Sequence, residues 1–146
     1  MKRIAGIDYG KARIGVALSD ERQIIASPFI CLAAAKKMEA TAQGILTTLA
    51  PYQPLDAIVL GHPLLFSGEA GEMAGLVQQL AELLRQSQAA PVILWDERLT
   101  SAQVERTLRE ANLNRKKRSK LIDALAAAAI LQNYLDTEGR ISNAKT

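Results

Sequence analysis

Carboxylates stand at the ends of apolar segments in this 146-residue sequence. Asp8 lies near the end of the apolar stretch 3–9, and Asp96 and Glu97 end a second stretch at 91–97. Asp123 falls on a stripe at helical spacing whose other members are Ala127, Ile130 and Tyr134. Because a buried carboxylate costs several kcal/mol unless something pairs with it, each of these acids needs a partner.

Carboxylates that meet at one site would repel each other and raise each other's pKa values, and a divalent cation removes that conflict. Ligand sets made of oxygen suit Mg²⁺ or Mn²⁺. The sequence has one cysteine and one histidine, which leaves no Cys/His cluster for zinc. The acids therefore point to a site for Mg²⁺ or Mn²⁺.

Each acid also has a structural interpretation. Asp8 can cap the turn at Gly10, and Glu97 or Asp123 can sit in the first turn of a helix, where the helix dipole favours a negative charge. Side chains alternate along a strand, so only one of Asp96 and Glu97 can join Asp8.

The composition is that of an ordinary globular protein, with 49% apolar and 23% charged residues. We expect one domain over 1–138 and a flexible tail over 139–146. A single cysteine, Cys31, permits no internal disulfide, which indicates a reducing, cytoplasmic location. No apolar run approaches membrane-spanning length, and the first residues do not have the pattern of a signal peptide.

Positive charge is concentrated in residues 98–120. This segment holds eight Lys or Arg against two acids, a net +6, while the whole chain carries +3. Such asymmetry is typical of a surface that binds a polyanion, although a solvated helix end would have the same composition. Arg98 lies at the start of the segment, and its densest run is Arg115, Lys116, Lys117 and Arg118.

The order of elements predicts an α/β fold. Apolar alternation indicates strands at 3–9, 13–19, 23–32, 56–62 and 91–97, and apolar residues at helical spacing indicate helices at 36–50, 73–84, 100–111 and 119–136. Three strands joined by hairpins, followed by alternating helices and strands, predict a mixed five-stranded sheet with helices on both faces. The first strand, apolar on both sides, is expected to be central, which places Asp8 at the carboxyl edge where such sheets build their sites.

Four motifs in order resemble the YqgF family, also called RuvX-like Holliday-junction resolvases, of the ribonuclease H-like superfamily. They read GIDYGKARIGVA from residue 6, VLGHPL from 59, DERLTS from 96 and LIDALAAAAILQNYL from 121. The resemblance implies that Asp8, Glu97 and Asp123 are the catalytic acids and hold the metal, two Mg²⁺ or Mn²⁺ ions. It also favours Glu97 over Asp96.

The resemblance further implies a nuclease that processes the 5′ end of pre-16S rRNA in the bacterial cytoplasm, with Holliday-junction cleavage as the alternative. The expected partners are structured RNA or branched DNA and no membrane, and the chain would act as a monomer or a homodimer. We expect Arg13 and Arg98 to bind the scissile phosphate, unless they are merely solvated. The run Arg115–Arg118 would follow the phosphate backbone without reading bases.

Two rival interpretations remain. The first motif also resembles the phosphate-binding hairpin of sugar kinases and actin-like ATPases, but those proteins use two such domains. A non-catalytic RNA-binding or ribosome-assembly factor could keep the same acids. Where the family has a leucine this chain has His62, which is either a proton shuttle or an ordinary loop residue, and the following loop departs from the family at Leu65 and Glu69.

Overall fold

The computed structural model describes residues 2–63, 71–96 and 115–144. These ranges contain five strands, three α-helices and a short 3-10 helix: β1 Arg3–Tyr9, β2 Arg13–Ser19, β3 Ala26–Ala33, α1 Met38–Leu49, η1 Ala50–Tyr52, β4 Leu55–His62, α2 Glu72–Gln86, β5 Val92–Asp96 and α4 Arg115–Ala144. The predicted helix 100–111 and the loop residues Leu65 and Glu69 lie outside the described residues. Among the described helices, none has the length and hydropathy needed to cross a bilayer.

The strands form one mixed sheet in the order β3-β2-β1-β4-β5. β1 pairs antiparallel with β2, and β2 antiparallel with β3. β1 also pairs parallel with β4, and β4 parallel with β5. The predicted mixed five-stranded sheet and its central first strand are therefore confirmed.

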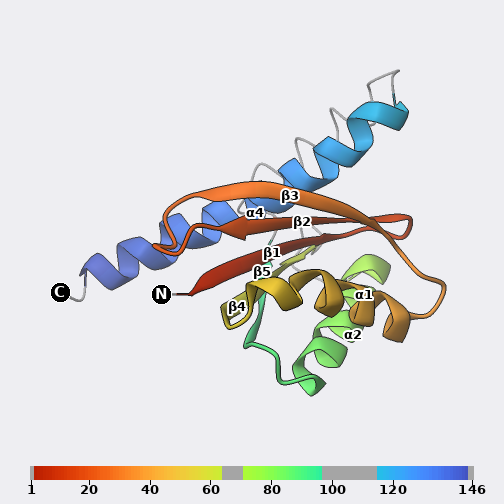
Figure 1. Cartoon of the computed structure of the whole chain (residues 1–146), viewed down its shortest axis with the longest axis horizontal. Helices are drawn as coiled ribbons and strands as arrows, with labels where there is room; N and C mark the ends of the chain where they lie inside the picture. Colours follow the sequence, from red (N-terminus) through yellow and green to blue (C-terminus); the bar gives the residue numbers. More distant parts are fainter. Residues whose placement is uncertain (1, 64–70, 97–114, 145–146) are drawn as a thin grey trace.

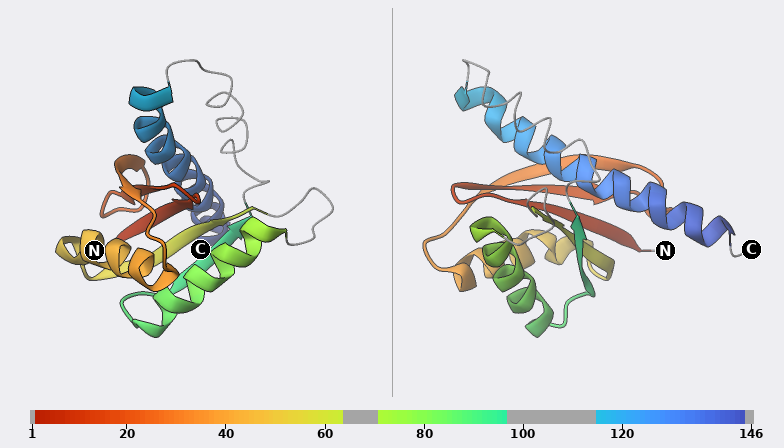
Figure 2. Two further views of the ribbon diagram at one scale, coloured as in Figure 1. Left: turned by 90° about the vertical axis from the view of Figure 1, so that its right-hand side faces the viewer. Right: turned by 180° about the vertical axis from the view of Figure 1, so that it is seen from behind.

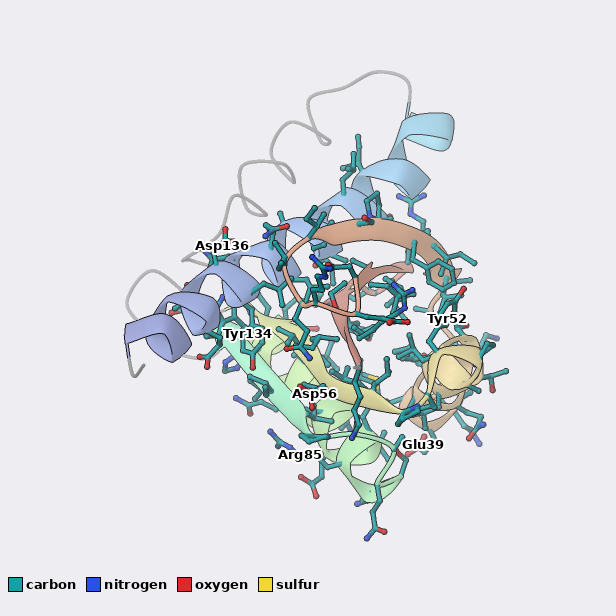
Figure 3. All side chains as sticks on the ribbon, turned by 60° about the vertical axis from the view of Figure 1, so that its left-hand side comes forward. Glu39, Tyr52, Asp56, Arg85, Tyr134 and Asp136 are labelled. Carbon is teal, nitrogen blue, oxygen red and sulfur yellow. The ribbon has the colours of Figure 1, made fainter. Side chains whose placement is uncertain are left out.

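Helices cover both faces of this sheet (Figures 1 and 2). α1 and α2 pack on one face over a core that includes Ile7, Ile14, Ile58 and Leu60. α4 crosses the other face over β1, β2 and β3. β5 is attached to both layers, because Arg85 of α2 donates to the Val92 carbonyl at 3.1 Å and Tyr134 of α4 packs edge to face on Trp95 (Figure 3).

β3 begins three residues later than the predicted strand 23–32. The Asp20 carboxylate accepts hydrogen bonds from the backbone N–H groups of Ile24 and Ile25, at 2.8 and 2.9 Å, and Gln23 has a positive φ of 60°. This local turn uses residues that would otherwise extend the strand, which is a common role for aspartate at a hairpin.

α4 is longer at both ends than the predicted helix 119–136. It begins at Arg115, so the basic run Arg115–Arg118 is part of the helix rather than a connection before it. Lysine and arginine are good helix formers, and neither Pro nor Gly interrupts the run. The helix also continues past Gly139 to Ala144, where the sequence predicted a flexible tail.

Candidate active site

Asp8 is buried in the central strand, with only 3% of the residue exposed. Its neighbours Ile7 and Tyr9 point into the core under α1 and α2. Alternation along the strand therefore turns Asp8, like Gly6, toward α4. Gly6 faces this helix closely, since a Cβ built there would lie 2.7 Å from the Cβ of Leu131. The central strand thus presents its carboxylate to α4 at the carboxyl edge of the sheet.

Asp123 of α4 is brought next to Asp8 by a glycine. Asp8 is paired across the β1–β2 ladder with Gly15. A Cβ on Gly15 would lie 1.9 Å from the backbone oxygen of Asp123, so α4 can rest on β2 here because the residue has no side chain. Asp123 is only 5% exposed. Two acids 115 positions apart in the sequence are therefore neighbours at one sheet edge.

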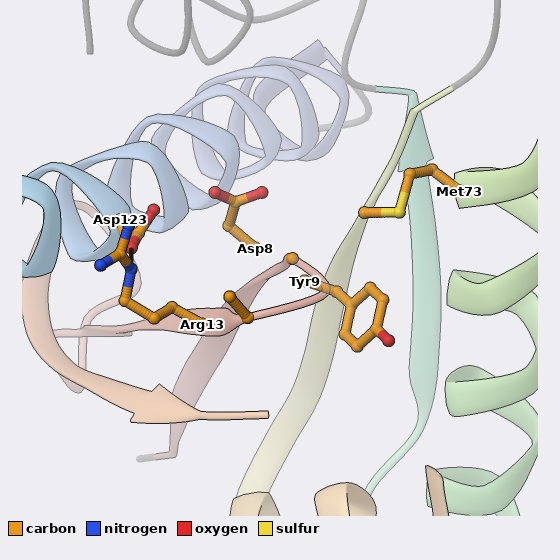
Figure 4. Close-up of a pocket in the computed structure, with 7 residues that line it drawn as sticks. Asp8, Tyr9, Arg13, Met73 and Asp123 are labelled. Atoms are coloured by element: carbon orange, nitrogen blue, oxygen red, sulfur yellow. Dashed lines mark hydrogen bonds and ion pairs between the residues drawn. The ribbon is translucent and has the colours of Figure 1, made fainter. Parts of the chain in front are cut away.

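Side chains of β2 and β3 contact the carboxylate of Asp123. Arg13, at the start of β2, donates its Nε hydrogen to Oδ2 at 3.1 Å (Figure 4). The thiol of Cys31, which is paired with Gly15 across the β2–β3 ladder, lies 3.8 Å from the same oxygen. Asp8, Gly15 and Cys31 form one row across three strands, and Asp123 lies above it.

A cavity of about 250 Å³ opens beside the two acids. Its walls are Asp8, Tyr9, Gly10, Ala12, Arg13, Met73 and Asp123 (Figure 4). Gly10 and Ala12, from the turn between β1 and β2, line one side, and Met73 of α2 contributes an apolar group. Because a water molecule occupies about 30 Å³ in the liquid, the cavity has room for several waters or for a hydrated ion beside a phosphate oxygen.

Asp96 and His62 lie on the other face of the sheet. The two residues pair across the β4–β5 ladder, and Nε2 of His62 is 3.1 Å from Nε2 of Gln78 on α2. Burial lowers the pKa of His62, and the negative charge of Asp96 partly opposes this. The sheet therefore separates both residues from Asp8, and His62 does not lie beside Asp8 and Asp123.

The structure brings together three of the predicted site residues, namely Asp8, Asp123 and Arg13. Glu97 and Arg98 lie outside the described residues. Arg115–Arg118 begin α4, eight to five residues before Asp123. Within the described ranges, no three His, Cys, Asp or Glu residues form a metal-binding group. The two described acids supply the oxygen donors that Mg²⁺ or Mn²⁺ prefers, so the donor chemistry fits the predicted metal.

Two residues that shape the site were not recognised in the sequence. Gly15 reads as a glycine in an apolar strand, and Cys31 as an isolated thiol. The hairpin register links them, since residues paired directly opposite Asp8 must share its face. Aligning 6–9 with 14–17, and then 13–16 with 30–33, both antiparallel, would have placed both on the row of Asp8.

The sheet order, with α4 lying over three strands and an acidic site at the carboxyl edge, defines a ribonuclease H-like fold. The solved structure of RuvC from T. thermophilus in complex with a Holliday junction substrate has the same fold. Its TM-score is 0.56, at 18% identity, covering 94% of this chain and 96% of that chain.

The chain belongs to the RuvX family, whose sequence model is described as "Holliday junction resolvase" and matches residues 2–137. A relative from Protochlamydia amoebophila (strain UWE25), named "Putative pre-16S rRNA nuclease", is 49% identical and covers 92% of this chain and 93% of its own. A relative of the same name from Desulfitobacterium hafniense (strain DSM 10664 / DCB-2) is 39% identical, covering 92% of each. The prediction of an enzyme that hydrolyses phosphodiester bonds agrees with these names.

Proposed function

We propose that this protein is a metal-dependent endonuclease that acts on structured nucleic acid and processes the 5′ end of pre-16S rRNA. The observation that carries the proposal is the convergence of Asp8 and Asp123 on one cavity at the carboxyl edge of the sheet. Buried acids brought together from a central strand and a distant helix are costly for the fold. The proposed metal site explains why the chain retains these acids, because a bound cation would use their negative charge.

Asp8 and Asp123 would hold the metal, with Glu97 as the proposed third ligand and two Mg²⁺ or Mn²⁺ ions as the expected complement. When bound, such ions lower the pKa of a coordinated water and stabilise negative charge on a phosphate. The chain's own part is to fix these carboxylates on a rigid strand and a rigid helix. It also shields one side of the reacting phosphate with the apolar wall at Met73.

The substrate would reach the site along α4. A helix rises about 1.5 Å per residue, so the run Arg115–Arg118 begins roughly 12 Å before Asp123 along the helix axis. At that distance, lysine and arginine would contact phosphates one or two nucleotides away from the cleaved bond. Such contacts give affinity and position without base recognition, so selectivity would come from the shape of the folded nucleic acid.

The choice of pre-16S rRNA follows the names of relatives that are 49% and 39% identical over nearly the whole chain. A second candidate substrate is the four-way DNA junction, which the family description favours. Symmetric cleavage of a junction would call for a two-fold dimer. A sedimentation measurement with and without a junction therefore accompanies the substrate assay.

The deciding experiment incubates the purified chain with end-labelled pre-16S rRNA 5′ fragments and with four-way junctions, in Mg²⁺, in Mn²⁺ and in EDTA. An identically prepared Asp8→Asn sample controls for contaminating nuclease. We expect cleavage of the rRNA fragment at defined positions, dependent on the metal and absent from Asp8→Asn. Preferential cleavage of the junction would favour the second candidate. Binding without cleavage in any metal would overturn the proposal and favour a non-catalytic RNA-binding factor.

A further inference from the structure

The guanidinium of Arg13 connects a buried acid to an open cavity. The Asp123 side chain is 7% exposed, whereas the Arg13 side chain is 42% exposed, and both residues line the cavity beside Asp8. Figure 4 shows the arginine extending from the start of β2 toward α4. The same side chain therefore reaches the proposed metal ligand at one end and solvent at the other.

The ion pair uses only the inner part of the guanidinium. Nε donates to Asp123 Oδ2 at 3.1 Å. Among the described residues, neither terminal nitrogen of Arg13 has a hydrogen bond comparable to that of Nε. Arginine carries five N–H donors in a planar fork, so four of them belong to the terminal amino groups. That fork matches the geometry of two oxygens on a phosphate.

α4 rests on a glycine of β2 at the position of Asp123. The Nε–H of Arg13 and the thiol of Cys31, both on the sheet, donate to Oδ2 of Asp123. Hydrogen bonds of this kind orient carboxylates that bind metals, and their loss typically weakens metal binding 10- to 100-fold.

We propose that Arg13 has two separable roles: Nε positions Asp123 for the metal, and the terminal amino groups bind a phosphate of the substrate. This inference rests on the proposed function, because it assigns Asp123 to the metal and a phosphate diester to the cavity. It makes Arg13 a positioning residue for the metal ligand as well as a substrate contact. Binding of metal and binding of phosphate would then be organised by one side chain.

The two roles can be separated by comparing Arg13→Gln with Arg13→Leu. The glutamine Nε2 stands the same number of bonds from Cα as the arginine Nε, so it can keep the hydrogen bond to Asp123. Leucine has a similar stem without any donor. Both variants lose the positive charge and the terminal amino groups, so a difference between them reports the positioning hydrogen bond alone.

Metal affinity is measured on the full chain without nucleic acid, by titrating Mn²⁺ and following the free-ion signal in electron paramagnetic resonance. We expect Arg13→Leu to bind Mn²⁺ about 10- to 100-fold more weakly than Arg13→Gln. In an Asp123→Asn background the two variants should bind equally. Lys11→Gln is the matched control: it removes a charge from the neighbouring turn, where Nζ of Lys11 pairs with Glu72, and it should leave Mn²⁺ affinity unchanged.

Phosphate contact is measured in EDTA by fluorescence anisotropy with a labelled pre-16S rRNA 5′ fragment. Both Arg13 variants should bind more weakly than wild type, with the slope of log affinity against log salt flatter by about 0.7 to 0.9, the value for one phosphate contact. Thermal melts of each variant establish that the proteins compared are folded.

Each result decides one part of the inference. Equal Mn²⁺ affinity in Arg13→Gln and Arg13→Leu would overturn the positioning role, and a wild-type salt slope in both would overturn the phosphate contact. If the wild type neither binds Mn²⁺ nor cleaves, the proposed function itself fails. If the wild type binds Mn²⁺ and cleaves, while the two variants have equal Mn²⁺ affinity and the salt slope of the wild type, only this inference fails.

Discussion

The face of the sheet under α1 and α2 is filled by large aliphatic side chains, whereas much of the face under α4 is lined by glycine and alanine. Ile7, Ile14, Val16, Ile58 and Leu60 face the first layer. Gly6, Gly15, Ala17 and Ala57 face α4, which contributes its own alanines at 126–128. A buried Val, Leu or Ile side chain contributes about 1.5–3 kcal/mol, so the first face supplies more hydrophobic stabilisation for each residue.

Small residues on the α4 face serve a different purpose. They let the helix backbone approach the strands closely enough for Asp123 to stand beside Asp8. The comparison suggests that one face stabilises the fold while the other positions charged groups. Substitutions on the two faces should therefore change different measured quantities.

The largest effect is expected from Asp8→Asn, which should abolish cleavage and leave the fold intact. The substitution removes a negative charge and a metal-binding oxygen, and it relieves like-charge repulsion with Asp123. We therefore expect the metal-free variant to melt no lower than the wild type. Cleavage assays and thermal melts in EDTA measure the two quantities. Cleavage by Asp8→Asn at the wild-type rate would disprove the proposed mechanism.

Ile58→Ala on the opposite face is the matched comparison for Asp8→Asn. This fully buried side chain lies in the core under α1 and α2. Its loss should cost about 2–5 kcal/mol of unfolding free energy while the cleavage rate per folded molecule stays close to that of the wild type.

The next largest effect separates Asp96 from Glu97. Asp96 is paired with His62 on the α2 face, away from Asp8. We expect Asp96→Asn to keep substantial activity and Glu97→Gln to be inactive, because alternation along the strand predicted at 91–97 turns these two residues to opposite sides. Parallel cleavage assays of the two variants measure this. The opposite pattern would mean that the assignment of the third acid is wrong by one residue.

Gly15→Ala tests the close approach of α4. The added Cβ would lie 1.9 Å from the Asp123 backbone oxygen, so the helix or strand must move. Overpacking of this kind costs about 1–3 kcal/mol or more, and a displaced Asp123 should also weaken Mn²⁺ binding. Urea unfolding and Mn²⁺ titration measure the two effects.

Gly44→Ala in α1 is the control, since a Cβ there meets nothing within 4 Å. In the interior of a helix this change should stabilise the protein by roughly 1 kcal/mol. Equal effects of the two substitutions would show that Gly15 is not a contact point between the helix and the sheet.

The basic run Arg115–Arg118 should affect binding more than chemistry. Replacing all four residues with alanine should weaken nucleic-acid binding whatever the sequence and flatten the salt slope. Successive helix positions are about 100° apart around the axis, so four consecutive residues cannot all face one duplex. We therefore expect a change of about two units, with cleavage of saturating substrate changed less. Titrations at several salt concentrations measure it, and an unchanged slope would exclude the run from the binding surface.

Much of the architecture could be predicted because it depends on local patterns. The central position of β1 followed from apolar residues on both of its sides, and the layers followed from the order of strands and helices. The start of β3 was missed because the Asp20 carboxylate forms a turn that alternation does not reveal.

The site was predicted less completely, because its contacts join distant segments. The bond from Arg13 to Asp123 spans 110 residues, and nothing near Arg13 in the sequence indicates that partner. The start of α4 was missed because a charged run is compatible with either a helix or a connection. The role of Gly15 depends on a helix crossing that the chain order alone does not specify.

The smallest effect is expected from His62→Gln, which tests whether the α2 face takes part in chemistry. His62 contacts Gln78 and Asp96 rather than the acids, so we expect cleavage to change by less than about twofold, far below the 10²–10⁴-fold effect of losing a general acid or base. Burial lowers the pKa of His62 in the folded protein, from an ordinary value of 6.5. The stability that comes from its neutral form is therefore present above that value and is lost as the pH falls below it. The variant should lose less stability than the wild type when urea unfolding is compared at pH 7.5 and pH 5. A large loss of cleavage at pH 7.5 would show that the imidazole acts at the site, and the division of labour between the two faces would not hold.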